Sequence, residues 1–518
     1  MSGRSNLLWM GLVLGVALLA GAWLMQRRAP QSEVVYENAR LLDETIDRVA
    51  SFYVDSLSQS GLYDLAIDGM LRNLADPYTA FLRTEDLREL TLNTTGNYSG
   101  VGIRIESSDG WITVVSPIAG TPADSAGILP GDRIVAINGQ STHGWTVDRA
   151  VSQMRGRENE VVNFEIARAG VGETLPFVLS RASVHVSSVR HSQLVADRVG
   201  YVWLELISEK SAEEVVEAVE RLRGEGAQTL ILDLRLNPGG ILDQGIAVSD
   251  LFLRDGAEVV ETRGRAMLAS REYSASEPER WSDMPLIVLV NEYTASAAEI
   301  IAGALQDHDR ALLLGTRTFG KGLVQTVFPL GRAEALKLTT GRWYTPVGRS
   351  IQRHDGLPND STSADSSEVF RTFGGRHLTG GGGIRPDVDV SEELDDTVEG
   401  ELSRALGADV QALRDVIATY AVEYEARDQE GDSVVVTPVM RGEILRGLRA
   451  RGVNVPGPVW NAAAQAVDRQ LRYQILRYAF GTEAEMRERT MDDPVVRRAI
   501  DLLQQADSAR ELFEIASR

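Results

Sequence analysis

The chain has 518 residues, 43% of them hydrophobic, with no cysteine and a formal net charge of −21. This length predicts several domains, and the ordinary apolar content argues against extensive disorder. The negative charge argues against nucleic acid as a partner, because phosphate binding needs a basic surface, and the lack of cysteine excludes disulfides, thiol nucleophiles and thiolate metal sites.

An apolar run lies near the N-terminus. Leu7 to Met25 spans 19 residues without a charged side chain, with Arg4 before it and Arg27 and Arg28 after it. At about 1.5 Å per residue, the run nearly spans the roughly 30 Å hydrocarbon core of a bilayer. We therefore expect residues 1–28 to form a cytoplasmic stub and a transmembrane anchor, with a cleaved signal segment as the alternative. This predicts a single-pass protein of the cell inner membrane whose remaining chain is periplasmic.

Two regions of different pattern follow the anchor. Residues 33–95 carry apolar side chains at helical spacing, which predicts an N-terminal helical region. Residues 96–183 change to short β-rich runs separated by Gly-Asp and Asn-Gly turns, which predicts a small β domain.

The second half of the chain divides again. Residues 184–392 alternate buried strands with helices, the pattern of an α/β domain. Within it, residues 352–383 are rich in Gly, Ser and Asp and predict a surface loop. Residues 393–518 read as charged amphipathic helices. The loop is open to interpretation as a lid or an inert segment, and the tail as an assembly, partner-binding or substrate-steering element.

One serine stands where a nucleophile would be activated. Ser296 follows a buried apolar strand and precedes an apolar helix that begins with Ala297. The free N–H groups and the positive dipole end of such a helix stabilise developing negative charge, which suits an acyl-transfer nucleophile. An ordinary helix cap is the alternative explanation for this serine.

A lysine supplies a candidate base. Lys321 lies between Gly320 and Gly322, and Gln325 follows four residues later, on the same face in either a helix or a strand. A lysine acts as a base only when its amine is neutral, which burial favours. Gln325 could then orient that amine.

Two other chemistries compete with this dyad. Gly315 to Lys321 matches most of a phosphate-binding loop, but Gly322 stands where Ser or Thr would bind Mg²⁺. A histidine triad would need one of six histidines, none of them in a GxSxG or HExxH context, and His308 occupies a polar helix end. No metal site and no cofactor is predicted.

Several motifs in order resemble the C-terminal processing (tail-specific) peptidases, over roughly residues 35 to 392. They are Ala66-Ile67-Asp68-Gly69-Met70-Leu71 with Asp76-Pro77-Tyr78-Thr79-Ala80-Phe81-Leu82, the PDZ-like Tyr98-Ser99-Gly100-Val101-Gly102-Ile103 with Gly131-Asp132, Asp233-Leu234-Arg235-Leu236-Asn237-Pro238-Gly239-Gly240, Thr294-Ala295-Ser296-Ala297-Ala298-Glu299, Gly320-Lys321-Gly322-x-x-Gln325 and Trp343-Tyr344-Thr345-Pro346-x-Gly348-Arg349-Ser350-Ile351-Gln352. The long 352–383 segment and the helical tail depart from the common core.

The resemblance implies a mixed α/β fold with a crotonase/Clp-peptidase-like catalytic core, an inserted PDZ domain and a C-terminal helical extension. It implies a serine endopeptidase with Ser296 as nucleophile, Lys321 as general base and Gln325 orienting the lysine. Oxyanion donors would come from Ala297 and from Gly239 or Gly240.

The PDZ resemblance implies how substrates are chosen. Backbone N–H groups of Tyr98, Ser99, Gly100, Val101, Gly102 and Ile103 would bind a substrate's terminal carboxylate. The substrate tail would add as a β-strand, and the domain would gate activity. Arg168, near a strand end, is a candidate gating residue, with a solvent-facing position as the alternative.

These features predict protein or peptide substrates with accessible apolar C-termini, cleaved in the cell envelope, with membrane contact through residues 7–25. The sequence allows either a homo-oligomer or binding to an adaptor partner. The alternative function is a catalytically silent PDZ scaffold that binds protein C-termini.

Overall fold

The computed structural model describes residues 35–168, 171–266, 269–331, 334–353, 369–390, 404–424 and 434–516. Two compact units are present. Of the described residues, the first unit contains those up to Leu82 and those within Val327–Leu338, and the second contains all the others.

The first unit is mainly helical. Residues 35–52 form a helix, and α2 (Gln59–Arg72) follows. The Ser58 hydroxyl caps α2 by accepting a hydrogen bond from the Gly61 N–H at 3.1 Å, as serine commonly does at this position. Strand β1 (Ala80–Leu82) then pairs antiparallel with residues 335–337 of β18 (Glu334–Tyr344).

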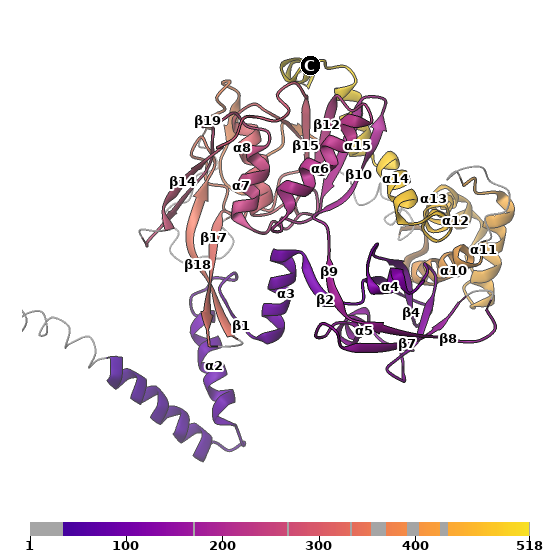
Figure 1. Ribbon diagram of the computed structural model, residues 1–518, viewed down its shortest axis with the longest axis horizontal. Helices are drawn as coiled ribbons and strands as arrows, with labels where there is room; N and C mark the ends of the chain where they lie inside the picture. Colours follow the sequence, from indigo (N-terminus) through magenta and orange to yellow (C-terminus); the bar gives the residue numbers. More distant parts are fainter. Residues whose placement is uncertain are drawn as a thin grey trace, which may run out of the picture. The chain divides into compact units, whose positions relative to one another are not determined.

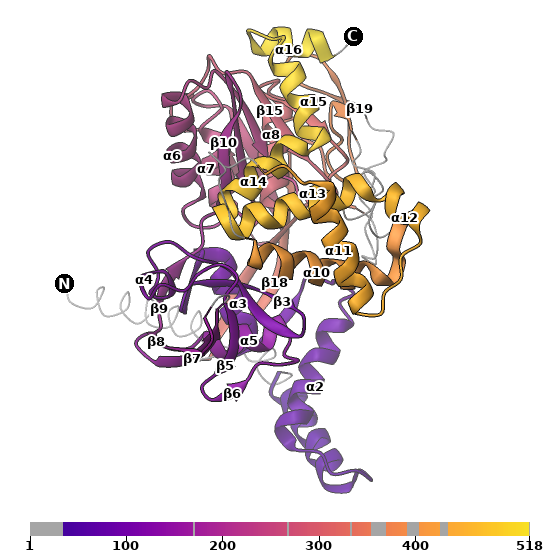
Figure 2. The same cartoon turned by 90° about the vertical axis from the view of Figure 1, so that its right-hand side faces the viewer.

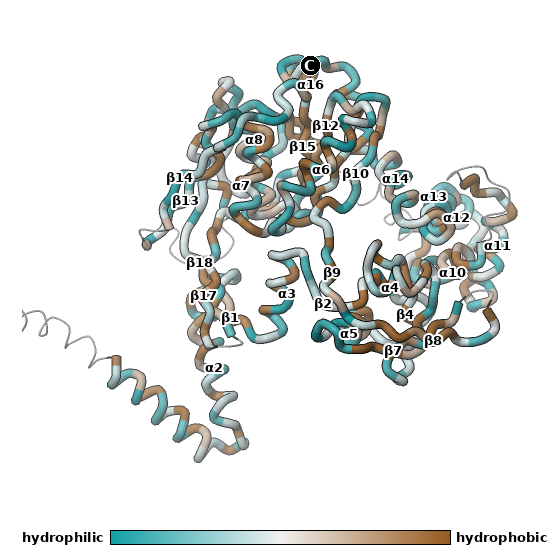
Figure 3. The backbone as a smooth tube through the Cα atoms, in the orientation of Figure 1, coloured by the Kyte–Doolittle hydropathy of each residue, from teal (hydrophilic) through white to brown (hydrophobic). Residues whose placement is uncertain are grey.

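The second unit contains a six-stranded sheet in the order β10-β11-β12-β15-β16-β21. Its strands are β10 (Val189–Ala196), β11 (Val199–Leu204), β12 (Thr229–Asp233), β15 (Leu286–Val290), β16 (Leu312–Gly315) and β21 (Val388–Asp389). The β10–β11 pair is antiparallel and the other pairs are parallel. Every residue of β12 and β15 is buried, as in parallel sheets covered on both faces, and β15 is largely brown in Figure 3.

Helices cover both faces of this sheet (Figures 1 and 2). Helices α6 (Ser211–Gly224), α7 (Leu242–Asp250) and α8 (Ala297–Asp307) share one apolar core with it. Helices α15 (Pro494–Leu503) and α16 (Ala509–Ala516) share a second core with its opposite face. The last helices of the chain therefore complete the sandwich around the sheet.

A smaller antiparallel sheet adjoins α8. Strand β13 (Glu258–Gly264) pairs with β14 (Arg271–Ser274) and with residues 341–344 of β18. Strand β17 (Leu323–Leu330) pairs with β18. A short hairpin of β19 (Val369–Arg371) and β20 (His377–Thr379) lies in the segment predicted as a surface loop, whose residues 354–368 fall outside the described residues.

The β-rich segment forms a separate antiparallel sheet in the second unit. It contains β3 (Ile103–Ser108), β4 (Trp111–Pro117), β5 (Arg133–Ile137), β6 (Gln140–Ser141), β7 (Val161–Ala167) and β8 (Leu175–Ser180), with α4 (Pro122–Ser125) and α5 (Val147–Met154). Alternate residues of β7, such as Val162 and Phe164, are buried in its core, as a half-covered sheet requires. Helix α3 (Thr84–Thr95) precedes it, and β2 (Asn97–Gly100) pairs with β9 (Ala182–His185) where the chain enters and leaves.

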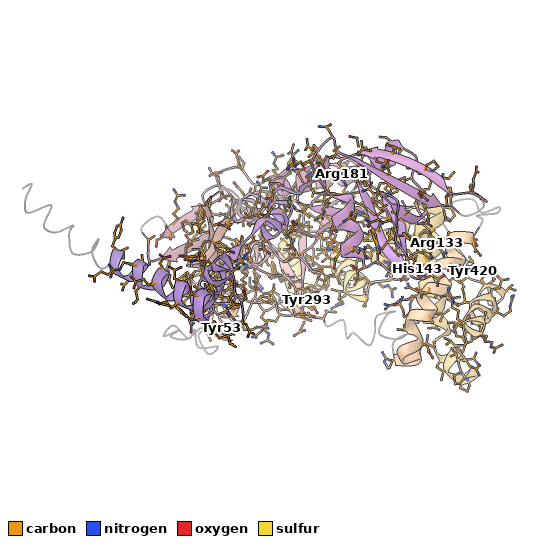
Figure 4. All side chains as sticks on the ribbon, turned by 90° about the horizontal axis from the view of Figure 1, so that it is seen from below. Tyr53, Arg133, His143, Arg181, Tyr293 and Tyr420 are labelled. Carbon is orange, nitrogen blue, oxygen red and sulfur yellow. The ribbon has the colours of Figure 1, made fainter. Side chains whose placement is uncertain are left out.

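The C-terminal region adds a helical cluster. It contains η3 (Gly407–Asp409), α10 (Val410–Glu423), α11 (Pro438–Ala450), α12 (Gly457–Ala462), α13 (Ala464–Ile475), the π-helical turn η4 (Leu476–Phe480) and α14 (Thr482–Asp492). These helices share a core of their own, and the Asp109 N–H in the β3–β4 turn donates to Asp415 of α10 at 3.5 Å. Figure 4 labels Arg133 of β5 and Tyr420 of α10 on this side of the unit.

One element of the predicted fold class needs correction. The sequence predicts a transmembrane helix, but within the described ranges no helix is both long and apolar enough to cross a bilayer. The predicted anchor, Leu7 to Met25, falls outside those ranges. The fold class is therefore corrected to a mixed α/β protein with a separate antiparallel β domain and a C-terminal helical region.

Candidate active site

Ser296 lies directly before α8, after the loop that leaves β15. Its backbone has φ 55° and ψ −119°, a conformation that residues with a side chain normally avoid. The first N–H groups of a helix have no partner within the helix, so the N–H of Ala297 is available beside Ser296. The strained turn therefore places a hydroxyl at the positive end of α8.

A buried carboxylate connects Ser296 with Lys321. Glu299 is 0% exposed, and its Oε2 accepts hydrogen bonds from the backbone N–H groups of Ser296 (2.8 Å) and Lys321 (2.9 Å). Its Oε1 accepts from the Thr318 hydroxyl (2.5 Å) and the Gly320 N–H (2.7 Å). Burial raises the pKa of the Glu299 carboxyl, and these four donors partly offset that effect.

Sequence reasoning quoted Glu299 within a motif but gave it no role. A signal was present, because Ser296-x-x-Glu299 matches a capping box, in which the third helical residue bonds back to the cap. The three additional bonds, to Thr318, Gly320 and Lys321, could not be predicted, since they join segments 19 to 22 residues apart.

Lys321 and Gln325 lie together as their spacing predicts. The Lys321 Nζ donates to the Gln325 Oε1 at 3.1 Å, and both side chains are half-buried. Gln325 lies on β17, which begins two residues after the lysine. The Trp343 indole N–H donates to the Lys321 carbonyl at 3.0 Å, which fixes the backbone of the lysine against β18.

The same geometry argues against a phosphate-binding loop. Such a loop needs free backbone N–H groups at the start of a helix. Here the N–H groups of Gly320 and Lys321 donate to Glu299, and the chain continues into strand β17.

Residues 234–240, called the glycine loop below, lie against residues 295–297, called the serine turn. A side chain on Gly239 would begin 2.8 Å from the Ser296 Cβ and 2.9 Å from the Ala297 nitrogen. The Gly239 N–H already donates to the Asn237 Oδ1 at 2.8 Å. Of the two predicted glycine donors, Gly240 is therefore the better candidate, together with Ala297.

Asn237 organises the glycine loop and was not singled out from the sequence. It is fully buried, its Nδ2 donates to the Leu204 carbonyl at 2.7 Å, and its own carbonyl accepts from the Ala295 N–H at 2.9 Å. The side-chain amide of Asn237 thus joins β11 to the glycine loop, and its backbone carbonyl joins that loop to Ala295 beside Ser296. An asparagine before Pro-Gly-Gly also suits a simple turn, so the sequence did not distinguish this role.

The predicted carboxylate-binding segment runs from β2 into β3. Tyr98, Ser99 and Gly100 pair with β9, and Val101 and Gly102 connect them to Ile103, the first residue of β3. The carbonyl groups of Val101 and Gly102 accept hydrogen bonds from Ala123 and Ile118.

Arg168 follows β7 and contacts its own domain. Its Nε and Nη2 donate to the two carboxylate oxygens of Asp132 at 2.7 Å each, and its Nη2 also donates to the Gly127 carbonyl at 2.9 Å. Asp132 is 1% exposed, so this ion pair holds the α4–β5 connection in place. The gating role of Arg168 stays a prediction.

The histidine considered as a competitor, His308, lies away from Ser296. His308 caps the opposite end of α8, about 16 Å along an 11-residue helix, and its Nε2 bonds to the Glu258 carbonyl at 2.7 Å. Across the described ranges, no group of three or more His, Asp or Glu side chains could hold a metal ion.

Comparisons with known proteins identify the family of the chain. Residues 198–363 match the model of peptidase family S41, and residues 113–168 match a PDZ domain model. A carboxy-terminal-processing protease from Bartonella bacilliformis is 38% identical over 346 residues, covering 66% of this chain and 78% of that protein. A carboxyl-terminal-processing protease from Synechocystis sp. is 35% identical over 384 residues, covering 70% of this chain and 88% of that protein.

Among solved structures, a photosystem II D1 C-terminal processing protease is 29% identical and covers 72% of this chain and 97% of its own, with a TM-score of 0.37. The identity and coverage of the curated relatives establish membership. The predicted family and its PDZ domain are confirmed. The alternative of a catalytically silent scaffold is wrong, because the family is one of proteases. The chain belongs to the S41 carboxy-terminal-processing serine proteases that carry a PDZ domain.

Proposed function

We propose that this protease cleaves proteins near their C-termini with a Ser296–Lys321 dyad. The observation that carries the proposal is the shared Glu299 carboxylate, whose Oε2 binds the backbone N–H groups of both residues. Four hydrogen bonds to one buried carboxylate hold the loops of Ser296 and Lys321 in a fixed relative position. Proton transfer between two side chains requires such precise positioning.

The proposed reaction begins when the neutral Lys321 amine takes the proton of the Ser296 hydroxyl. The serine oxygen attacks the scissile carbonyl carbon, and the N–H groups of Ala297 and Gly240 stabilise the oxyanion. The protonated lysine then passes its proton to the leaving amine, which gives an acyl-enzyme. Water attacks the acyl group, Lys321 takes its proton, and Ser296 recovers it. Gln325 orients the amine throughout.

Substrate choice in this proposal belongs to the PDZ domain. The segment Tyr98–Ile103 binds the terminal carboxylate, the substrate tail extends along β3, and occupation of the domain gates cleavage. We place the reaction in the cell envelope, which the cysteine-free sequence favours and cell fractionation would test.

The test compares three full-length proteins. The chain has three lysines, at positions 210, 321 and 337, and Lys210 is exposed, so Lys210→Ala is a matched control. Mass spectrometry follows an unstructured substrate with an apolar C-terminus, without metal or nucleotide. We expect wild type and Lys210→Ala to release the same fragments and Lys321→Ala to release none. Equal cleavage by Lys321→Ala would refute the dyad.

A further inference from the structure

The glycine loop has an ionic anchor outside the dyad. Arg235 donates from Nε to the Asp233 Oδ1 at 3.0 Å and from Nη2 to the Asp233 Oδ2 at 2.7 Å. The same Nη2 donates to the Asp493 Oδ2 at 2.7 Å. Burial disfavours charge on Arg235, but Asp233 and Asp493 outweigh it and raise the arginine pKa. The loop with the proposed oxyanion donor is therefore tied to the C-terminal helices.

Asp493 bonds both to the start of α15 and to the side chain of Arg235. It is the N-cap of α15, where its Oδ1 accepts from the N–H groups of Val495 (2.8 Å) and Val496 (3.1 Å), while Oδ2 holds Arg235. Helix α15 is itself held against the central sheet by its apolar face. The position of Asp493 is thus determined by α15 on one side and by the end of α14 on the other.

The other end of α14 is tied to the PDZ domain. Glu485 near the start of α14 is 3% exposed and accepts from the Arg477 Nε (2.5 Å) and Nη2 (2.9 Å). Arg477 also donates from Nη1 to the Glu106 Oε2 at 3.0 Å, and the Tyr478 hydroxyl donates to the Glu106 Oε1 at 2.6 Å. Both belong to η4, and a π-helical turn often marks a functional position.

Glu106 lies on β3, the strand that a substrate tail would join. Among the strands described, β3 pairs only with β4, so its other edge is open to a peptide. Glu485 and Asp493 are eight positions apart along α14 and its cap, about 12 Å at the helical rise. Partly buried, hydrogen-bonded ion pairs resist separation because each lost partner leaves a desolvated charge.

We propose that α14 couples PDZ occupation to the active site, through Glu106, Arg477 and Glu485 at one end and Asp493 and Arg235 at the other. A peptide added to β3 repositions Glu106, the helix transmits the shift, and Arg235 sets the Gly240 N–H for the oxyanion. The inference rests on the proposed function and adds the C-terminal helices as its regulatory element. Asp493 and Arg477 are positioning residues, so their effect is expected on kcat and on its response to a peptide.

The test separates the PDZ ligand from the cleaved peptide. The full-length enzyme cleaves an internally quenched, unstructured peptide with an amidated C-terminus, which lacks the carboxylate that the PDZ site would bind. A second peptide with a free apolar C-terminus is added as activator. We expect the activator to raise the wild-type kcat at least about fivefold, within the range typical of coupled sites. In Asp493→Asn and in Arg477→Gln, the ratio of kcat with activator to kcat without activator falls to near one. Fluorescence anisotropy still detects binding of the activator to both variants.

Three controls make the result specific. Asp493→Asn preserves the cap of α15, because asparagine caps as well as aspartate, and thermal melting checks the fold. Arg477→Lys keeps the charge but replaces three donor nitrogens with one, so it is expected to retain only part of the stimulation. Arg451→Gln breaks another ion pair between the PDZ domain and the tail, to Asp109 at 3.2 Å, that is not connected to α14, and it should respond like wild type.

The outcomes are distinguishable. Wild-type stimulation that survives in both Asp493→Asn and Arg477→Gln overturns the coupling, as does equal loss in Arg451→Gln. Cleavage that the activator does not affect in wild type also overturns it but leaves the dyad intact. An enzyme that cleaves neither the amidated peptide nor a substrate with a free apolar C-terminus contradicts the proposed function itself.

Discussion

Glu299 shows how one side chain determines the geometry of a site without reacting. Its carboxylate is the only group described that bonds to the backbone of both Ser296 and Lys321. Replacing it with glutamine retains the shape but substitutes an amide NH₂ for one acceptor oxygen. Because all four partners are donors, at least one of these hydrogen bonds must break.

For Glu299→Gln we therefore expect kcat for peptide cleavage to fall at least about tenfold, since a buried donor is left unsatisfied beside the proposed nucleophile. Steady-state kinetics with an amidated peptide measures this change, and circular dichroism verifies the fold. Unchanged kcat in a folded variant would contradict the assigned position of Glu299.

The pKa of Glu299 also predicts a dependence of stability on pH. Burial raises this pKa above its ordinary value of 4.5, so the folded protein takes up the proton more readily than the unfolded chain. The stabilising contribution is complete below pH 4.5 and is lost as the pH rises through the folded pKa. Urea unfolding of wild type and Glu299→Gln across this window should show the loss in wild type only.

Among the elements, the glycine loop is the most restricted in space. Gly240 has φ 154°, and a Cβ there would lie 1.8 Å from the Ile207 carbonyl oxygen. Gly240→Ala should therefore displace the proposed oxyanion donor and lower kcat at least about 100-fold, as loss of one such donor does elsewhere. Gly256→Ala is the control, since Gly256 also has a positive φ (78°) but an added Cβ would meet open space. Similar kinetics for both variants would show that the clash at Gly240 is harmless.

The elements that the sequence predicts well are those with a local pattern. The i to i+4 spacing of Lys321 and Gln325 predicts the 3.1 Å contact, because residues four apart share a face in a helix and in a strand. The choice between Gly239 and Gly240 could not be made in this way. It depends on Asn237, whose side-chain oxygen accepts the hydrogen bond of the Gly239 N–H, a contact that no local sequence pattern specifies.

At the scale of the whole molecule, the C-terminal helices belong to the core. Leu503 on α15 is 0% exposed and shares a cluster with Ile231 and Leu289 of the central sheet. We expect Leu503→Ala to lower the free energy of unfolding by about 2–5 kcal/mol through lost burial and a cavity. Val439→Ala, at a side chain that is 69% exposed, should change it by less than about 0.5 kcal/mol. Urea unfolding followed by tryptophan fluorescence compares the two, and equal effects would contradict the packing role of α15.

The sequence indicated these helices but not their position. The spacing of Val496, Ile500 and Leu503 predicts an amphipathic helix, yet an apolar stripe does not state which surface covers it. That surface is the sheet face opposite α8, to which β12 and β15 contribute from more than 200 residues earlier in the chain. The contact is set by long-range packing, which no local pattern reports.

The backbone of Ser296 has an evolutionary consequence. At φ 55° and ψ −119°, any residue with a Cβ is strained, whereas glycine adopts this region at little cost. If Ser296 is the nucleophile, as proposed, its mutation to glycine would therefore make the protein inactive and more stable at the same time. Selection for cleavage must continually oppose a substitution that folding alone would favour, and in a lineage released from that selection this serine would be among the first residues to drift.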